Sequence, residues 1–303
     1  MISVNNIYKS FKKLQVLNGV SFTVLDGEIY ALVGGNGTGK TTLLNIISGI
    51  EKADVGDIRV ENKDTRAIHA IPNVIGYVQD VSSAFEYMTA EEYLQYLSSC
   101  ARLEKDVAKQ RVDQLVEMFS MQPYMKRRIS TYSKGMKQRL AIAAVLLGNP
   151  KVILLDEPTS ALDTEAKENL KAIFEKLKKS GKSVIISTNS LWDVENFCDR
   201  LGFLSKGRLK FEKTVQELSN RRRKCYIIVG QQGQIAAIYN YYLNKNDYLC
   251  ELNEFKIVLT PPPELTMKDI INELNDNAFS ILAINEYTPT FKDVFLKEAR
   301  KND

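Results

Sequence analysis

The chain has 303 residues, enough for one large domain and a second, smaller one. Its 44% hydrophobic and 26% charged residues are typical of a globular protein, and a net charge of +4 is too small to indicate a nucleic-acid partner, so we expect none. No apolar run approaches the roughly 18 residues that span a bilayer, which predicts a cytoplasmic chain that would reach a membrane only through a partner.

The N-terminal part combines strands with a glycine-rich loop. Apolar residues alternate over residues 2–4 and 20–24, which predicts strands of an antiparallel sheet. The buried run 29–33 leads directly into the pattern G-x-x-x-x-G-K-[ST] at residues 34–41, and a helix is expected over 41–47. A strand, a glycine loop and a helix in this order predict a site for the phosphates of a nucleoside triphosphate.

The residue types of this loop suit phosphate chemistry. Successive backbone N–H groups wrap the phosphates, glycines allow the close approach, and the helix adds its positive end. Lys40 is expected to reach the terminal phosphates, and the Thr41 hydroxyl is placed for Mg²⁺. The predicted nucleotide-binding residues of the loop are Gly34, Gly35, Asn36, Gly37, Thr38, Gly39, Lys40, Thr41 and Thr42.

The middle of the chain alternates helices and buried strands. Residues from about 89 to 121 are expected to be helical, and a further helix follows the run Tyr132-Ser133-Lys134-Gly135-Met136 and continues to residue 147. The buried strand 152–155, a helix over 164–179 and the buried strand 184–187 follow. This alternation predicts a parallel sheet with helices on both faces.

Two adjacent carboxylates follow the strand 152–155. Asp156 ends an apolar strand, where an unpaired carboxylate would be costly, and a role on Mg²⁺ accounts for it. Glu157 would face the terminal phosphate and polarise a water molecule for in-line attack. A pair of helix N-caps is the structural alternative, but it does not explain the Pro158 and Ser-Ala-Leu-Asp turn that follow.

The composition changes near residues 219–224, after which shorter elements alternate. Strand-like runs occupy 225–229, 256–259 and 281–284. Helices are expected over 267–274 and 291–301. We therefore predict a nucleotide-binding domain at 1–220 and a small α+β accessory domain at 221–303.

The order and spacing of these motifs over roughly residues 1–215 resemble the ATP-binding subunit of an ABC transporter. The resemblance implies ATP and Mg²⁺ as cofactors, with Phe11 stacking on adenine (Tyr8 is the competing candidate) and Gln79 contacting Mg²⁺ and sensing the γ-phosphate. Ser133 and Gly135 match the signature that closes over the ATP of a second subunit. Asp163 matches an aspartate at the dimer contact. The implied catalytic residues are Glu157, Gln79 and Asn189, and the implied metal ligands are Thr41, Gln79 and Asp156.

Two residues depart from the pattern of the family. Lys134 replaces a glycine of the signature, where its charge either adds to the phosphate site or points outward. Asn189 stands where the family has a histidine, and an amide can donate a hydrogen bond but cannot carry a proton or a charge. Loss of a transition-state contact of this kind typically costs on the order of 10²–10³ in rate.

The resemblance implies an α/β phosphate-loop fold with an antiparallel β subdomain, a parallel core sheet and a helical subdomain, plus the small C-terminal α+β domain. It also implies a homodimer, or a heterodimer with a second ABC subunit, that hydrolyses ATP beneath an integral membrane permease on the inner face of the cell membrane. The segment 80–96 would receive the permease. The segment 288–296 resembles the tails of subunits that power the export of drugs, antibiotics and bacteriocin-like peptides.

Two other functions are compatible with the sequence. A nucleotide-gated scaffold that hydrolyses little is supported by Asn189 alone. A soluble ABC protein of translation or DNA repair is disfavoured by the single nucleotide domain and by the absence of a long coiled-coil insertion.

Overall fold

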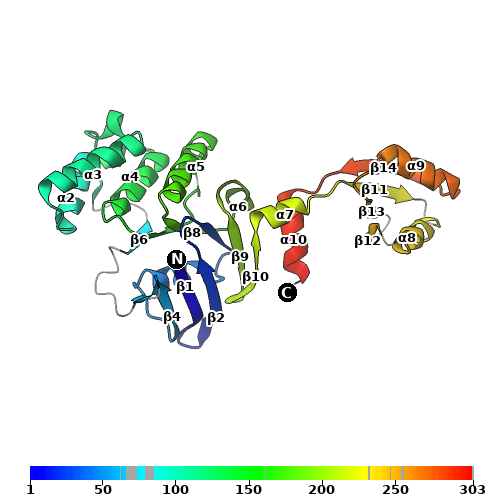
Figure 1. Cartoon of the computed structure of the whole chain (residues 1–303), viewed down its shortest axis with the longest axis horizontal. Coiled ribbons are helices and arrows are strands. Elements are labelled where there is room, and N and C mark those ends of the chain that lie inside the picture. The colour runs from blue at the N-terminus through cyan, green and yellow to red at the C-terminus, as the bar shows by residue number, and fades with distance from the viewer. Residues whose placement is uncertain are drawn as a thin grey trace. The chain divides into compact units, whose positions relative to one another are not determined.

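A computed structural model of the chain divides it into two compact units, Met1–Val215 and Gln216–Asp303 (Figure 1). The structure describes residues 1–61, 63–65, 74–78, 85–160, 162–230, 233–245, 247–253 and 256–301. Gln79 therefore lies outside the described residues, as do the first five residues of the segment expected to receive a permease.

The first unit contains a small antiparallel sheet in the order β2-β1-β4-β5. Alternating apolar residues place one face of β1 and β2 in the core, and the two strands pair with Ile2 opposite Val24. These strands confirm the expected antiparallel subdomain. The bounds are β1 Ile2–Phe11, β2 Leu14–Val24, β4 Val55–Val60 and β5 Lys63–Asp64.

The second sheet of this unit has the order β10-β9-β3-β8-β7-β6. Its five strands from β9 to β6 are parallel, and β10 adds an antiparallel edge, so the expected parallel sheet is in fact mixed. The strands are β3 Ile29–Val33, β6 Ile75–Val78, β7 Val152–Asp156, β8 Ser183–Thr188, β9 Arg200–Ser205 and β10 Arg208–Thr214.

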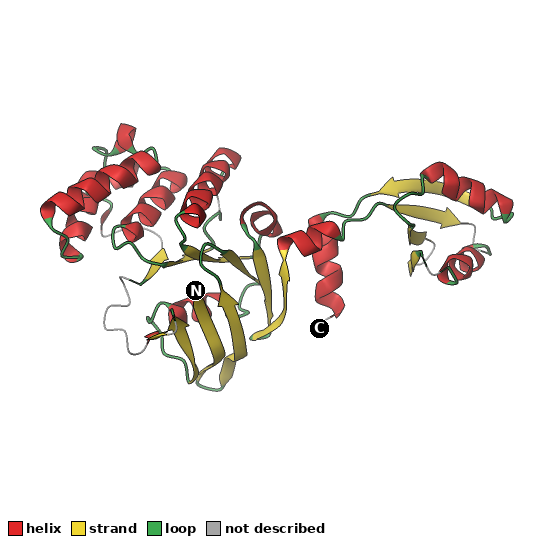
Figure 2. Cartoon of the chain, in the orientation of Figure 1, coloured by secondary structure: helices red, strands yellow, loops and turns green. Residues whose placement is uncertain are grey.

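Helices complete the first unit (Figure 2). α1 packs on β7 and β8, α5 on β8, and α6 on β3 and β8, while α2, α3 and α4 pack together as a helical group. The helices are α1 Lys40–Ile47, α2 Ala90–Cys100, α3 Lys105–Met118, α4 Lys134–Leu146, α5 Thr164–Lys179 and α6 Leu191–Phe197, with 3-10 turns at Gln122–Tyr124 and Ile129–Thr131.

The region 89–121, expected to be helical, contains two helices, α2 and α3, with a break between them. Thr89 and Glu92 form a capping box that starts α2, and α2 ends at Cys100. Arg102 then adopts a φ of 53°, a left-handed conformation that a continuous α-helix does not contain. The apolar spacing continues across this break, and for that reason the sequence pattern did not reveal it.

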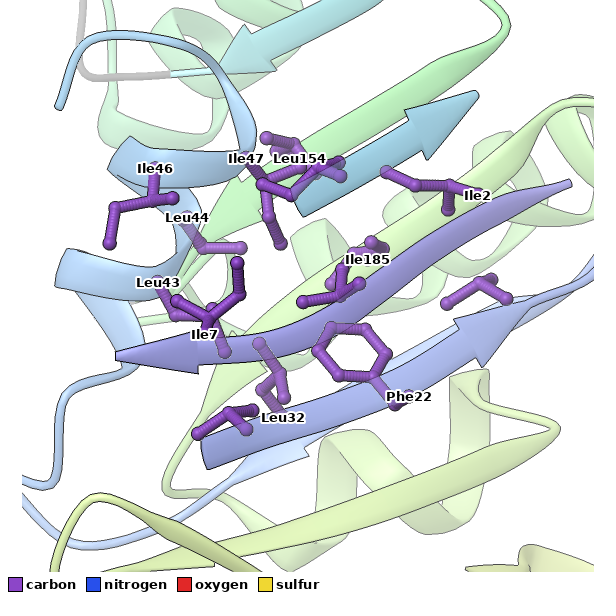
Figure 3. Close-up of a cluster of buried hydrophobic side chains, with 14 of the residues drawn as sticks. Ile2, Ile7, Phe22, Leu32, Leu43, Leu44, Ile46, Ile47, Leu154 and Ile185 are labelled. Carbon is purple, nitrogen blue, oxygen red and sulfur yellow. The ribbon is translucent and has the colours of Figure 1, made fainter. Parts of the chain in front are cut away.

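The core of the first unit lies between the antiparallel sheet, α1 and one face of the mixed sheet. Figure 3 shows Ile2, Ile7 and Phe22 of the antiparallel sheet packing toward α1 and the central strands. Because α1 follows the glycine loop directly, this apolar packing fixes the loop against the sheet.

The second unit has the chain order β11-α8-β12-β13-α9-β14 and the sheet order β12-β13-β11-β14. This is the ferredoxin-like arrangement, and it confirms the expected α+β domain. The side chains of α8 and α9 bury one face of the sheet. The bounds are α7 Val215–Asn220, β11 Cys225–Gly230, α8 Ile235–Leu243, β12 Leu249–Asn253, β13 Lys256–Thr260, α9 Met267–Asp276, β14 Ile281–Tyr287 and α10 Phe291–Lys301.

Candidate active site

The predicted chemistry gathers at the carboxyl edge of the mixed sheet. β3 ends at Val33 before the glycine loop, β7 ends at Asp156, and β8 ends at Thr188. Parallel pairing brings these ends together, with Val33 opposite Thr188 and Asp156 opposite Ser187. Open α/β sheets bind ligands at this edge.

The glycine loop is shaped by close contacts. A Cβ added at Gly34 would lie 2.5 Å from the Leu204 carbonyl oxygen, so only glycine fits there. Gly39 caps α1 with a φ of 106°, a backbone conformation that is strained for any residue with a side chain. The Thr38 hydroxyl donates to the Gly35 carbonyl at 2.9 Å and helps to fix the loop.

Lys40 lies under this loop and is 7% exposed. Its ammonium donates to the carbonyl oxygens of Gly34 and Gly35 at 2.8 and 3.1 Å. The nearest carboxylate oxygen is Oε1 of Glu157 at 3.7 Å. The hydrogen bonds of this buried ammonium go to neutral carbonyl oxygens, which do not neutralise its positive charge. Such a cation is suited to bind an anionic ligand.

Thr41 and Asp156 form the oxygen pair of the site. The Thr41 hydroxyl donates to Oδ2 of Asp156 at 2.8 Å, and the Ser187 hydroxyl donates to Oδ1 of the same carboxylate. Within the described ranges no group of three or more His, Cys, Asp or Glu could hold a metal ion. One carboxylate and one hydroxyl suit Mg²⁺, which usually takes one or two protein oxygens together with substrate phosphates.

Glu157 is held in an unusual backbone conformation. Its φ of 46° is left-handed, and its N–H donates to the Ser187 carbonyl at 3.0 Å. Burial raises the pKa of the Glu157 carboxyl, while Lys40 and a hydrogen bond from the Asn189 backbone act in the opposite direction. A desolvated carboxylate with a raised pKa beside a phosphate loop can serve as a general base.

A cavity of about 700 Å³ opens over these groups. Phe11 lies at its wall, 45% exposed, with the Lys9 ammonium 5.1 Å from the ring centroid, whereas Tyr8 is not among the lining residues. The lining residues are Phe11, Val16, Asn36, Gly37, Gly39, Lys40, Thr41, Thr42, Asn45, Tyr77, Val78, Lys134, Gln138, Asp156, Glu157 and Ser160.

The signature residues lie at the start of α4. Ser133 is the N-cap, with its hydroxyl accepting from the Met136 N–H at 3.3 Å, and Gly135 approaches Ala166 so closely that an added Cβ would lie 3.2 Å from its Cβ. Lys134 lines the cavity of its own chain. Asp163 caps α5 by accepting from the Ala166 N–H at 2.8 Å. The structure thus gives Ser133 and Asp163 capping roles beside the roles that the resemblance implies.

Sequence reasoning missed Ser187 as a site residue. Its hydroxyl bonds Asp156, and both its backbone oxygen and its hydroxyl accept from the Glu157 N–H. A polar residue at the end of an otherwise apolar buried strand was the available signal, since burial of a hydroxyl requires a partner.

Residues 17–160 match the protein family described as ABC transporter. An uncharacterized ABC transporter ATP-binding protein, YdbJ of Bacillus subtilis, is 31% identical over 98% of this chain and 94% of its own length. Two relatives at 28% identity are the linearmycin resistance ATP-binding protein LnrL of Bacillus subtilis and the bacitracin transport ATP-binding protein BcrA of Enterococcus faecalis. Both match 98% of this chain, and the matches cover 97% and 96% of their own lengths.

The solved structures that match this chain cover less of it than these relatives do. The cbiO1 protein of Clostridium perfringens, described as part of the ABC transporter complex cbiONQ, has a TM-score of 0.67, 27% identity and coverage of 73% of this chain and 90% of its own. A dimeric bacterial ABC transporter cassette has a TM-score of 0.62, 26% identity and coverage of 71% and 99%. Among the described residues, the helices are too short or too polar for any of them to cross a membrane.

Proposed function

This chain belongs to the ABC transporter family of ATP-binding proteins, and we propose that within this family it powers the export of drugs, antibiotics or antimicrobial peptides. As a member it is an ATP-hydrolysing cassette that binds ATP and energises a transporter. The observation that carries the export assignment is that LnrL and BcrA match almost the whole chain, accessory unit included, and bear names of resistance and transport. The solved cassettes quoted above match only 71–73% of it.

The residues that line the cavity would have different roles in ATP binding and hydrolysis. The glycine loop and Lys40 would hold the phosphates, while Phe11 stacks on the adenine and Thr42 extends the phosphate contacts at the start of α1. Thr41 and Asp156 would hold Mg²⁺, which when bound neutralises the negative charge of the phosphates. Glu157 would take a proton from the attacking water.

A second copy completes the site. Ser133 and Gly135 would contact the ATP of the other subunit, as the family signature does, and Lys134 adds a charge at the same end of α4. ABC cassettes dimerise, as the dimeric cassette structure illustrates. Sizing of a Glu157→Gln variant with ATP and Mg²⁺ tests the shared site, because blocked hydrolysis should trap the dimer. A persistent monomer at high protein and ATP concentrations would contradict it.

An exposed aromatic patch at the start of the helical group offers a place for the permease. Tyr87 and Tyr96 are 71% and 46% exposed, and the rings of Phe85 and Tyr96 are 5.8 Å apart. Exposed aromatic side chains that gather in this way are typical of contact surfaces. This patch belongs to the segment 80–96 that the resemblance assigns to the permease contact.

The export assignment is tested in cells that also carry the membrane protein that co-purifies with this chain. We expect accumulation of at least one compound in a panel of drugs and peptide antibiotics to fall with the wild-type chain and to stay unchanged with Glu157→Gln. If the complex forms and hydrolyses ATP but the accumulation of every compound is unaffected, the export assignment fails.

A nucleotide-gated scaffold with weak hydrolysis is the second candidate, and Asn189 favours it. Glu157 is nevertheless held by contacts that do not involve the Asn189 side chain, since its N–H bonds the Ser187 carbonyl at 3.0 Å and its carboxylate lies 3.7 Å from the Lys40 ammonium. Hydrolysis therefore remains the favoured function. Turnover measured beside ATP affinity separates the two, because a scaffold binds ATP tightly without measurable phosphate release.

A further inference from the structure

Asp193, in the first turn of α6, is a carboxylate with no solvent exposure. Its Oδ2 accepts hydrogen bonds from two hydroxyls, that of Thr188 at 2.9 Å and that of Thr159. Both threonines are buried as well. A carboxylate out of water is costly even with two such bonds, and its Oδ1 has no partner among the described residues. A group kept at this cost calls for a reason beyond packing.

The two threonines belong to the two segments that hold Glu157. Thr159 lies two residues after Glu157, in the turn that the Ser160 N–H closes on the Glu157 carbonyl at 3.1 Å. Thr188 ends β8 and directly follows Ser187, whose carbonyl accepts the Glu157 N–H at 3.0 Å. Asp193 therefore joins the turn that follows the base to the strand end that holds the backbone of the base.

The backbone of Glu157 needs such support. A left-handed φ of 46° is disfavoured for a residue with a side chain, and it persists only where the surroundings impose it. The same carboxylate also fixes the second segment from within, because the Thr188 hydroxyl that it binds accepts the Ser190 N–H at 3.0 Å, and Ser190 caps α6. Displacement of Asp193 would therefore disturb both the 157–160 turn and the 188–190 segment.

We propose that Asp193 is a positioning residue for ATP hydrolysis, one that holds the 157–160 turn and the end of β8 together so that the Glu157 backbone keeps the conformation that presents its carboxylate to the cavity. The proposal rests on the proposed role of Glu157 as the base.

The test compares four variants of the full chain: Asp193→Asn, Thr188→Val, their double mutant, and Glu195→Gln. The last removes a charge from an exposed position of the same helix and serves as the matched control. We expect Asp193→Asn and Thr188→Val each to lower kcat on the order of 10- to 100-fold, since a small misplacement of a catalytic group has that effect. ATP affinity should stay within about twofold, because neither residue lies among those that line the cavity, and Glu195→Gln should match the wild type.

The double mutant and the one tryptophan of the chain separate positioning from a loss of folding. If Asp193 acts through Thr188, the double mutant should lose little more than either single variant. Trp192, next to Asp193, makes an edge-to-face contact with Phe197, with ring centroids 5.4 Å apart, so its fluorescence on ATP addition reports the state of α6. If Asp193→Asn fails to fold, Thr188→Val and Thr159→Val, which conserve volume, carry the test instead.

Two outcomes distinguish a failure of this inference from a failure of the proposed function. If Glu157→Gln abolishes turnover but Asp193→Asn and both threonine variants keep wild-type kcat, the inference about Asp193 is wrong. If Glu157→Gln itself hydrolyses ATP at the wild-type rate, the role of Glu157 is wrong and the positioning role falls with it.

Discussion

Lys40 in the first unit and Lys245 in the second are both partly enclosed ammonium groups, but their partners differ. Lys40 donates to two backbone carbonyls and faces a cavity. Lys245 bonds the carboxylate of Glu273 and lies 4.7 and 5.2 Å from the ring centroids of Tyr241 and Tyr248. The first cation is available to a ligand, whereas the second is neutralised by its own domain.

The carboxylates show the same contrast. Glu273 accepts hydroxyl hydrogens from Tyr241 at 2.9 Å and from Tyr248 at 3.0 Å, in addition to the Lys245 bond, so its oxygens are occupied. The Glu157 carboxylate, in contrast, lies 3.7 Å from the Lys40 ammonium, beyond hydrogen-bond distance. A polar cluster whose donors and acceptors are all paired with one another stabilises a fold. A cluster that lacks some of these partners can bind and activate a ligand. The four predictions below test this distinction.

The largest effect is expected at the incomplete cluster. Glu157→Gln should lower kcat on the order of 10²–10⁴-fold, because the amide cannot accept the proton of the attacking water. Glu165→Gln, an exposed carboxylate in the first turn of α5, is the matched control and should keep the wild-type rate. Steady-state phosphate release measures both, and equal rates for the two variants would remove Glu157 from the mechanism.

Lys40→Ala should weaken ATP binding by about 100-fold or more. Lys40 would donate two charge-assisted hydrogen bonds to the phosphates, each contributing about 1.5–3 kcal/mol to binding. Their removal accounts for a loss of affinity of that size, because about 1.4 kcal/mol corresponds to a tenfold change. Lys245→Ala, the corresponding change in the second unit, should leave ATP affinity unchanged. Calorimetric titration with ATP and Mg²⁺ checks both, and an equal loss in the two variants would end the contrast between the two lysines.

Asn189→His should raise kcat by about tenfold with little change in ATP affinity. A charged imidazole donor exceeds a neutral amide donor by roughly 1–1.5 kcal/mol at the developing phosphate charge. The same substitution in a Glu157→Gln background should give no gain, because the base is missing. An unchanged kcat in Asn189→His would mean that the surrounding site has adapted to Asn189 and that the departure from the family pattern is neutral.

The smallest effect is expected in the second unit. Glu273→Ala should lower the free energy of unfolding of that unit by about 1–2 kcal/mol, since Lys245 and two tyrosine hydroxyls lose an acceptor that is partly exposed to water. ATP turnover should stay the same. Asp276→Ala, an exposed residue at the end of the same helix, is the control for denaturant unfolding. A turnover loss in Glu273→Ala would show that this cluster is more than structural.

Local patterns predicted many elements well. The helix expected over 164–179 coincides with α5, since Asp163 caps it and lysines end it. α8 was missed because the run Ile235–Leu243 is rich in apolar and aromatic residues and lacks the polar spacing of a surface helix. β12 was missed because Leu249–Asn253 is a short edge strand with little burial.

In the site, too, residues of local motifs were predicted and residues joined by long-range contacts were not. Lys40, Thr41 and Asp156 were predicted because each belongs to a motif whose residues are close in sequence. Asp193 was not predicted, because it is five residues from Thr188 but 34 from Thr159, and only the parallel pairing of β7 and β8 brings the second contact about. Long-range hydrogen bonds of this kind leave no periodic signal in one sequence.

Among the described residues, the apolar cluster around α1 and the apolar cluster of the ferredoxin-like unit share no member. A substitution in the ferredoxin-like core is therefore compensated by neighbours within that core, and one around α1 is compensated within its own. Over evolutionary time each core can drift by its own series of paired changes. Recombination between relatives at the junction near residue 215 would exchange one complete core for another, and so gives a route by which a single cassette design acquires different C-terminal units.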